Sequence, residues 1–167
     1  MTNNPDLLPL GPLVKAIAKK LTKKKATLMI AESATGGFIQ HVITALPGSS
    51  IFFLGGVVAY ADALKERLLQ VPAQTLQREG AVSEATASAM ALGVRLLLNA
   101  DYGLATTGIA GPTGGSQDKP VGTVYIAVAH HGFETITHQY TFSGTRKENK
   151  QHFSQAALQL LSDTIEG

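Results

Sequence analysis

The sequence predicts an α/β sandwich built around a mixed β-sheet, with a β-hairpin late in the chain. Short apolar runs typical of buried strands alternate with segments of helical periodicity. Two glycine-rich turns directly follow two of these apolar runs. The dipeptide His131-Gly132 separates two runs rich in β-branched residues and is typical of a hairpin turn. At 167 residues the chain has the size of one domain, expected to span residues 1–167.

The first part of the chain is predicted to alternate helix and strand. In the first helix, residues 10–24, apolar side chains recur at helical spacing and oppose a row of lysines. The apolar run 27–31 is predicted to be a strand, and the helix that follows, residues 37–45, ends before Pro47. Residues 54–60 are predicted to form the next strand.

The rest of the chain is predicted to form, in order, helices at 62–70, 72–78 and 84–98, strands at 102–106, 121–129 and 134–142, and a closing helix at 146–165. Gly80 ends the second of these helices. Ser83 caps the third, with Glu84 in its first turn, where a negative charge suits the helix dipole. Ligands of such sheets bind where strands end and helices begin, and both glycine-rich turns fall at such places.

Composition excludes several classes of function. The chain has no cysteine, so disulfides, thiolate metal sites and a cysteine nucleophile are excluded. The net charge is only +2, and the lysines of the first helix have no interleaved aromatic residues, which favours a solvated helix face over a nucleic-acid surface. No apolar targeting segment begins the chain, and no apolar run approaches the roughly 20 residues that span a bilayer, so we expect a cytoplasmic protein without membrane partners. Charged residues are 16% and hydrophobic residues 44%, which favours a homo-oligomer.

The two glycine-rich turns are the candidate binding loops. The first contains Thr35, Gly36 and Gly37, and the second, at residues 104–122, contains Gly108, Gly111, Gly114 and Gly115. Glycine permits positive φ and close approach of backbone N–H groups to a ligand, so a small anion such as phosphate is expected there. Neither turn has the spacing of a P-loop or of a dinucleotide fingerprint. Helix capping by Ser33 and Thr35, and a plain cluster of surface turns in the second loop, are the alternatives.

Polar side chains that could carry chemistry lie at or near the ends of predicted elements: Ser33, Tyr60, Lys65, Thr107 and Arg146. Arg146 begins a helix, where the dipole disfavours a cation unless an anion binds, and a plain surface arginine is the alternative. Lys65 is expected to face inward with the apolar Leu64 and Leu68, and an exposed helical lysine is the alternative. The histidines lack ligand spacing and no HExxH motif occurs, so we expect no metal and no cofactor.

Five segments together resemble one protein family. They read AESATGG, GSSIFFLGGVVAYADALK, GAVSE, TTGIAGPTGG with KPVGTVYIA, and FSGTR. In this order and spacing, from about residue 10 to the end, they resemble the CinA C-terminal domain family, the nicotinamide mononucleotide deamidases. The chain is similar to members that consist of this domain alone. One departure is Ala34, which stands where many relatives carry cysteine and which alters pocket packing without removing the nucleophile.

The resemblance implies an amidohydrolase that converts nicotinamide mononucleotide and water to nicotinate mononucleotide and ammonia, in pyridine nucleotide salvage. By position it implies Ser33 as nucleophile, Lys65 as base and Tyr60 as a neighbouring hydroxyl, with Thr107 and Arg146 in substrate binding. A lysine accepts a proton only when neutral, so its amine must be desolvated or lie near another cation. A nucleotide-binding relative without catalysis is the alternative function. A purely structural domain would leave the convergence of both loops unexplained.

Overall fold

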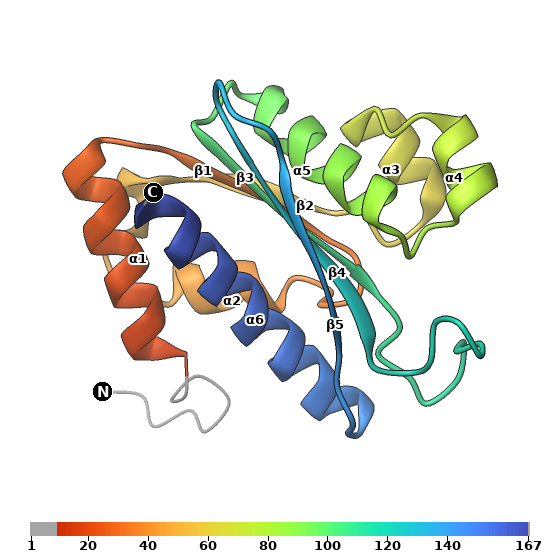
Figure 1. The fold of residues 1–167 in the computed structure, drawn as a ribbon. Coiled ribbons are helices and arrows are strands. Elements are labelled where there is room, and N and C mark those ends of the chain that lie inside the picture. Colours follow the sequence, from red (N-terminus) through yellow and green to blue (C-terminus); the bar gives the residue numbers. More distant parts are fainter. Residues whose placement is uncertain (1–9, 167) are drawn as a thin grey trace.

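The structure, a computed structural model, describes residues 10–166, which form a five-stranded mixed sheet between two layers of helices (Figure 1). The strands are β1 (Leu28–Glu32), β2 (Phe53–Val58), β3 (Tyr102–Gly108), β4 (Thr123–His130) and β5 (Ile136–Thr141), in the spatial order β2-β1-β3-β4-β5. β1 pairs in parallel with β2 and β3, whereas β4 is antiparallel to β3 and β5. Consequently β1, β2, β3 and β5 all end at one edge of the sheet, where β4 begins.

The two helical layers each close a separate apolar core. One face of the sheet is covered by α1 (Gly11–Lys24), α2 (Phe38–Thr44) and α6 (Arg146–Glu166), and the other by α3 (Asp62–Leu69), α4 (Ala73–Glu79) and α5 (Glu84–Leu97) (Figure 1). Ile17, Phe52 and Phe153 are buried in the first core, and Met90 and Val94 in the second. The predicted α/β sandwich around a mixed sheet is confirmed.

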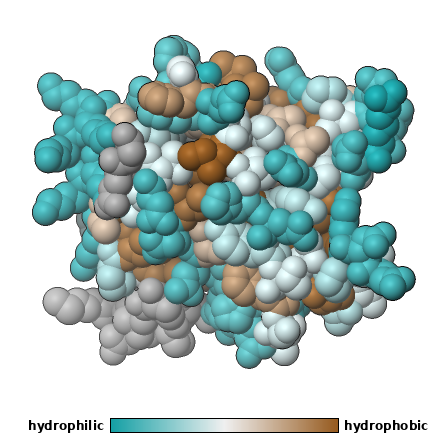
Figure 2. Space-filling view, in the orientation of Figure 1, coloured by the Kyte–Doolittle hydropathy of each residue, from teal (hydrophilic) through white to brown (hydrophobic). Residues whose placement is uncertain are grey.

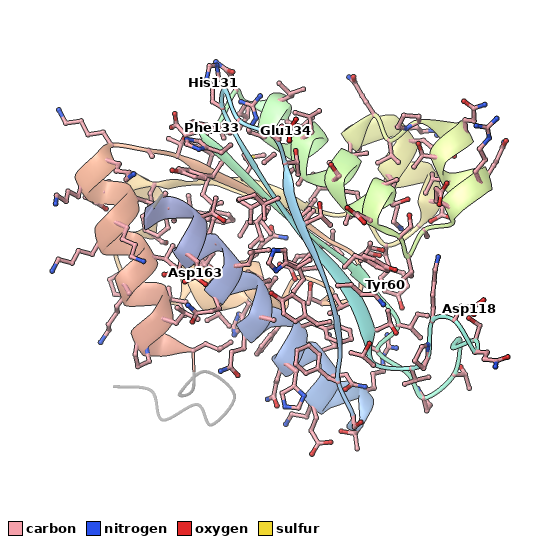
Figure 3. All side chains as sticks on the ribbon, in the orientation of Figure 1. Tyr60, Asp118, His131, Phe133, Glu134 and Asp163 are labelled. Atoms are coloured by element: carbon pink, nitrogen blue, oxygen red, sulfur yellow. The ribbon has the colours of Figure 1, made fainter. Side chains whose placement is uncertain are left out.

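The predicted elements are present, with ends displaced by one or two residues. The Ser83 hydroxyl accepts the Thr86 N–H and caps α5, as predicted. A short 3₁₀ helix at Ser49–Ile51 was not expected, because so short an element has no periodicity. The predicted hairpin joins β4 to β5, and its tip, with His131, lies at the opposite end of the sheet from Tyr60 (Figure 3).

The lysine-rich side of α1 is a solvated face, as predicted. Val14, Ile17 and Leu21 are buried, whereas Lys15, Lys19, Lys23, Lys24 and Lys25 are exposed. Figure 2 shows hydrophilic side chains projecting from the side of the molecule formed by α1. No helix within residues 10–166 is both long enough and apolar enough to cross a bilayer. The expectation that the chain begins without a targeting segment lies outside the described residues.

Apolar side chains also reach the surface on α3 and α5. The exposed ones are Leu64, Leu68, Leu92, Leu96, Leu97 and, just after α5, Leu98. Contact with a second copy would remove such area from water. The homo-oligomer stays a prediction, and this surface is the first place to test it.

Candidate functional site

A cavity of about 190 Å³ lies at the edge of the sheet where the parallel strands end. Its lining contains six of the residues predicted to act at the site: Ser33, Tyr60, Lys65, Thr107, Gly108 and Arg146. They come from segments far apart in the chain: the residues just after β1 and β2, helix α3, the end of β3 and the start of α6. The lining also contains Ala34, which was expected to affect the packing of the pocket, and four residues that were not predicted, which are Asp62, Ala81, Val82 and Ala110.

Ser33 is the first residue after β1. Its N–H donates to Thr106 O at 3.0 Å, which continues the β1–β3 pairing one residue beyond the strand and fixes the backbone at Ser33. The residue is 9% exposed and lines the cavity. Within residues 10–166 its hydroxyl makes no hydrogen bond, so it is available to a ligand.

Glu32, the residue before Ser33, caps α2 with its side chain. Its carboxylate is fully buried and accepts the N–H groups of Gly37, Ile39 and Gln40 at 2.9, 3.2 and 2.8 Å. An anion at this helix end satisfies N–H groups that lack partners within the helix. The alternative that Ser33 and Thr35 cap the helix is therefore wrong. Three of the N–H groups that follow this turn are thus already bonded to the protein's own carboxylate.

Glu32→Gln is expected to lower the free energy of unfolding by about 3 kcal/mol. The amide keeps the size of the side chain but loses its charge, and hydrogen bonds to charged groups contribute roughly 1.5–3 kcal/mol each. The urea midpoint should fall while the m value stays constant. Glu66→Gln makes the same chemical change on the exposed surface of α3 and should shift stability by no more than about 0.5 kcal/mol. A midpoint for Glu32→Gln equal to that of this control would contradict the capping role.

Other predicted binding residues lie outside the cavity lining. Thr35 is fully buried, with its hydroxyl 2.8 Å from that of Thr106, and Gly36 is exposed on the same turn as Gly37. In the second loop, Gly111 adopts a φ of 90° and offers its carbonyl to Arg146. Gly114 and Gly115 lie further along that loop. The part of these glycines in substrate binding stays a prediction.

Lys65 is buried, with a relative exposure of 1%. Its amine donates to Tyr60 O at 3.2 Å and to Asp62 Oδ1 at 3.1 Å, so it is held between the end of β2 and the first turn of α3. The expectation that Leu64 and Leu68 face inward with it is wrong, because both are exposed and Leu69 is the buried apolar residue of α3. Lys65 and Leu69, four positions apart, define the inward face of α3, and Leu64 and Leu68 lie to one side of it. Asp62 precedes Lys65 by three positions, which is the spacing of a helical ion pair.

Arg146 joins two parts of the site. One terminal nitrogen, Nη1, donates to Gly111 O at 2.7 Å, and Nη2 donates to the Tyr60 hydroxyl at 3.1 Å. The guanidinium therefore links the glycine-rich loop to Tyr60, the second residue after β2. Tyr60 itself is 61% exposed, so this hydrogen bond fixes a side chain that packing leaves free.

The start of α6 is set by a capping box that was not predicted from the sequence. Thr145 Oγ1 accepts the Glu148 N–H at 3.3 Å, while Glu148 Oε2 accepts the Thr145 N–H at 2.7 Å and its hydroxyl at 2.8 Å. Hydrogen bonds from the backbone and hydroxyl of Thr145 hold the pKa of Glu148 below its usual range. The carboxylate thus remains ionised and orients the turn that presents Arg146.

Two further contacts hold the second loop in place. The Thr107 hydroxyl donates to Ala81 O at 2.6 Å, across the cavity rim. Asn149 is fully buried, and its amide nitrogen donates to Ala110 O and to Gly144 O, both at 3.1 Å. Gly108 is required by close packing, since a Cβ there would lie 2.6 Å from Thr123 O.

The site offers a hydroxyl, a buried amine, a phenol and a guanidinium at one edge of the sheet. A free hydroxyl beside a group able to take up its proton is the arrangement needed for nucleophilic attack on an acyl carbon. Residues 10–166 contain no group of three or more histidine, aspartate or glutamate side chains placed to hold a metal ion. The side chains that line the cavity offer groups for acid–base and nucleophilic chemistry.

Comparison with known proteins identifies the family. Residues 11–165 match the model of the CinA C-terminal domain. A "CinA-like protein" of Syntrophus aciditrophicus is 52% identical over 147 residues, which are 87% of this chain and 35% of that protein. A "CinA-like protein" of Thermosynechococcus vestitus is 49% identical over 134 residues, covering 80% of this chain and 32% of its own length. The chain thus spans about a third of the length of these curated relatives.

Solved structures have the same fold. The competence/damage inducible protein CihA from Agrobacterium tumefaciens superposes with a TM-score of 0.91 at 34% identity, covering 95% of this chain and 96% of that one. The competence damage-inducible protein A (ComA) from Klebsiella pneumoniae gives a TM-score of 0.89 at 35% identity, covering 93% and 96%. On these matches in sequence and structure, the chain belongs to the CinA C-terminal domain family.

Proposed function

We propose that this protein is a nicotinamide mononucleotide amidohydrolase, which releases ammonia and leaves nicotinate mononucleotide. The observation that carries the proposal is the convergence of Ser33, Tyr60, Lys65 and Arg146 on one cavity. These residues match the family's catalytic and binding positions. The geometry supports acyl chemistry independently, because a free hydroxyl and a buried amine line the same small space.

The proposed reaction has two halves. The Ser33 oxygen attacks the carboxamide carbon while its proton passes to the neutral amine of Lys65, and the carbon–nitrogen bond then breaks as the leaving nitrogen takes up a proton. Ammonia departs and an ester to Ser33 remains. Water hydrolyses this ester to the carboxylate and restores the hydroxyl. For the first step, Lys65 must release one of its hydrogen bonds to Asp62 or Tyr60 O and turn toward Ser33.

An assay of the purified protein with nicotinamide mononucleotide tests the proposal. We expect equimolar ammonia and nicotinate mononucleotide, without added metal. Ser33→Ala protein, purified in the same way, controls for a contaminating amidase. Saturable binding of the nucleotide without release of ammonia would contradict the proposal and favour the inactive nucleotide-binding relative.

Arg146→Ala is expected to impair the mononucleotide more than nicotinamide riboside, which lacks the phosphate. Both substrates should lose turnover, because Tyr60 loses its hydrogen-bond partner. The mononucleotide should lose a further charge-assisted contact, worth roughly 1.5–3 kcal/mol in kcat/KM. The measurement is kcat/KM for both substrates with parent and variant.

Arg67→Ala serves as the control, because Arg67 is an exposed arginine of α3. This variant should leave both values unchanged. Equal losses for the two substrates in Arg146→Ala would mean that Arg146 acts on the protein's own groups and not on the phosphate.

A further inference from the structure

A second hollow, of about 470 Å³, lies beside the site cavity and shares Arg146 with it. Its lining consists of Phe38, Arg146, Lys147, Lys150 and Gln151. The site cavity, at about 190 Å³, is smaller than the roughly 300–1,000 Å³ typical of pockets for small molecules. A nucleotide whose carboxamide ring occupies the site cavity must therefore extend into adjoining space. The second hollow provides that space.

The second hollow is lined by positive charge, and two of its cations, Arg146 and Lys150, lie close together near the start of α6. Arg146 and Lys150 are four residues apart on α6, so they share a helix face on which like charges repel. Both lie near the helix N-terminus, where the dipole also disfavours cations. The carboxylate at this end, Glu148, accepts its hydrogen bonds from Thr145. Within residues 10–166 the Lys150 amine has no hydrogen bond or ion pair.

The Lys150 amine also lies against the turn that carries the nucleophile. A Cβ built on Gly36 would lie 3.4 Å from Lys150 Nζ, and Gly36 is three residues after Ser33. Gly36 has a φ of 62°, a conformation of the turn that favours glycine. Lys150 is thus a half-buried cation of α6 whose amine lies against the turn that contains Ser33 and Gly36.

We propose that the second hollow binds the phosphomonoester of a ribonucleoside 5′-monophosphate, with Lys150 as its dedicated cation and Phe38 as an apolar wall beside the ribose. The inference rests on the proposed function for the nicotinamide end of the substrate and adds the group that selects a nucleotide over a nucleoside. Arg146 joins the two hollows, but two of its donors already hold Gly111 and Tyr60. Among the described residues the Lys150 amine has no such partner, so all of its donors are available to the ligand.

Lys150→Gln tests this subsite, with Lys150→Arg to restore the charge and Lys19→Gln to remove one charge from the exposed face of α1. For nicotinamide mononucleotide, Lys150→Gln should raise KM about 10- to 100-fold with little change in kcat, and kinetics with nicotinamide riboside should be unchanged. Lys150→Arg should recover most of the affinity. Lys19→Gln should behave as the parent. Equal effects of Lys150→Gln on nucleotide and riboside would overturn the proposal.

A binding measurement separates this subsite from the proposed reaction. Calorimetric titration with ribose 5-phosphate should show binding to the parent protein and a Kd about 10- to 100-fold weaker in Lys150→Gln, while ribose should not bind either protein. Should the parent release no ammonia, the proposed function fails, yet loss of ribose 5-phosphate binding in Lys150→Gln still supports the subsite. An unchanged Kd in Lys150→Gln, or no binding by the parent, would overturn it.

Discussion

Ser33→Ala is expected to lower kcat for nicotinamide mononucleotide by about a thousandfold or more while leaving the fold intact. A reaction that proceeds through an ester to a serine loses its covalent route when the hydroxyl is removed. The fold should tolerate the change, because the hydroxyl makes no hydrogen bond within residues 10–166 and the adjoining backbone is held by Thr106 O. Steady-state ammonia release measures kcat, and thermal unfolding verifies the fold.

The matched control is Ser50→Ala, which removes an exposed hydroxyl from the 3₁₀ helix preceding β2, at the opposite edge of the sheet. It should keep the parent rate. Mass spectrometry of the parent protein, quenched during turnover, should detect the added mass of the nicotinate ester, and the Ser33→Ala protein should lack it. A Ser33→Ala protein that deamidates at near the parent rate would reduce Ser33 to a structural residue of the turn.

The fold could be predicted because its determinants are local. The first helix has a lysine face opposite Val14, Ile17 and Leu21, and the structure places these faces in solvent and in the core. Ser83 marks the start of α5 and does cap it. Parallel pairing of β1 with β2 and β3 follows from the crossover helices between them, and the hairpin turn accounts for the antiparallel β5.

The site could be predicted only as a set of residues at element ends. Parallel strands end at one edge, so side chains that follow β1, β2 and β3 meet there whatever their sequence separation. The contacts between these residues depend on side-chain directions that spacing does not give. The role of Glu32 was not predicted, because a buried acid in an apolar strand has no periodic signature. Its capping of α2 also depends on the turn at Gly36 and Gly37, which places the start of the helix against the Glu32 carboxylate.

The environment of Lys65 illustrates the same limit. The amine is buried, as the proposed base requires, yet the apolar partners expected on its own helix are exposed. What surrounds the amine comes from the end of β2 and from Asp62, whose side chain is 57% exposed. An amine held by a carboxylate in this way can serve as a fixed positive charge as well as a base. Whether Lys65 acts as a base or as a fixed cation therefore has to be decided by a substitution that separates charge from basicity.

Lys65→Arg makes that separation, and we expect it to lower kcat/KM by roughly 10²- to 10⁴-fold, the range that general acid–base catalysis contributes. Arginine keeps the positive charge and can still donate to Asp62, but it does not release its proton in a protein. Loss of activity with the charge retained would therefore identify basicity as the property that matters. Ammonia release at several substrate concentrations gives kcat/KM, and the thermal midpoint verifies folding.

Two companion variants make the result decisive. Arg67→Lys exchanges the same two residue types at an exposed position of α3 and should leave activity unchanged. Lys65→Met keeps an unbranched side chain without any charge, so it provides an inactive reference if the larger guanidinium disturbs packing at this buried position. Substantial activity in Lys65→Arg would show that Lys65 serves as a fixed cation held by Asp62. The base for Ser33 would then have to be another group lining the cavity. Tyr60, whose hydroxyl is hydrogen-bonded to Arg146, would be the first such residue to substitute.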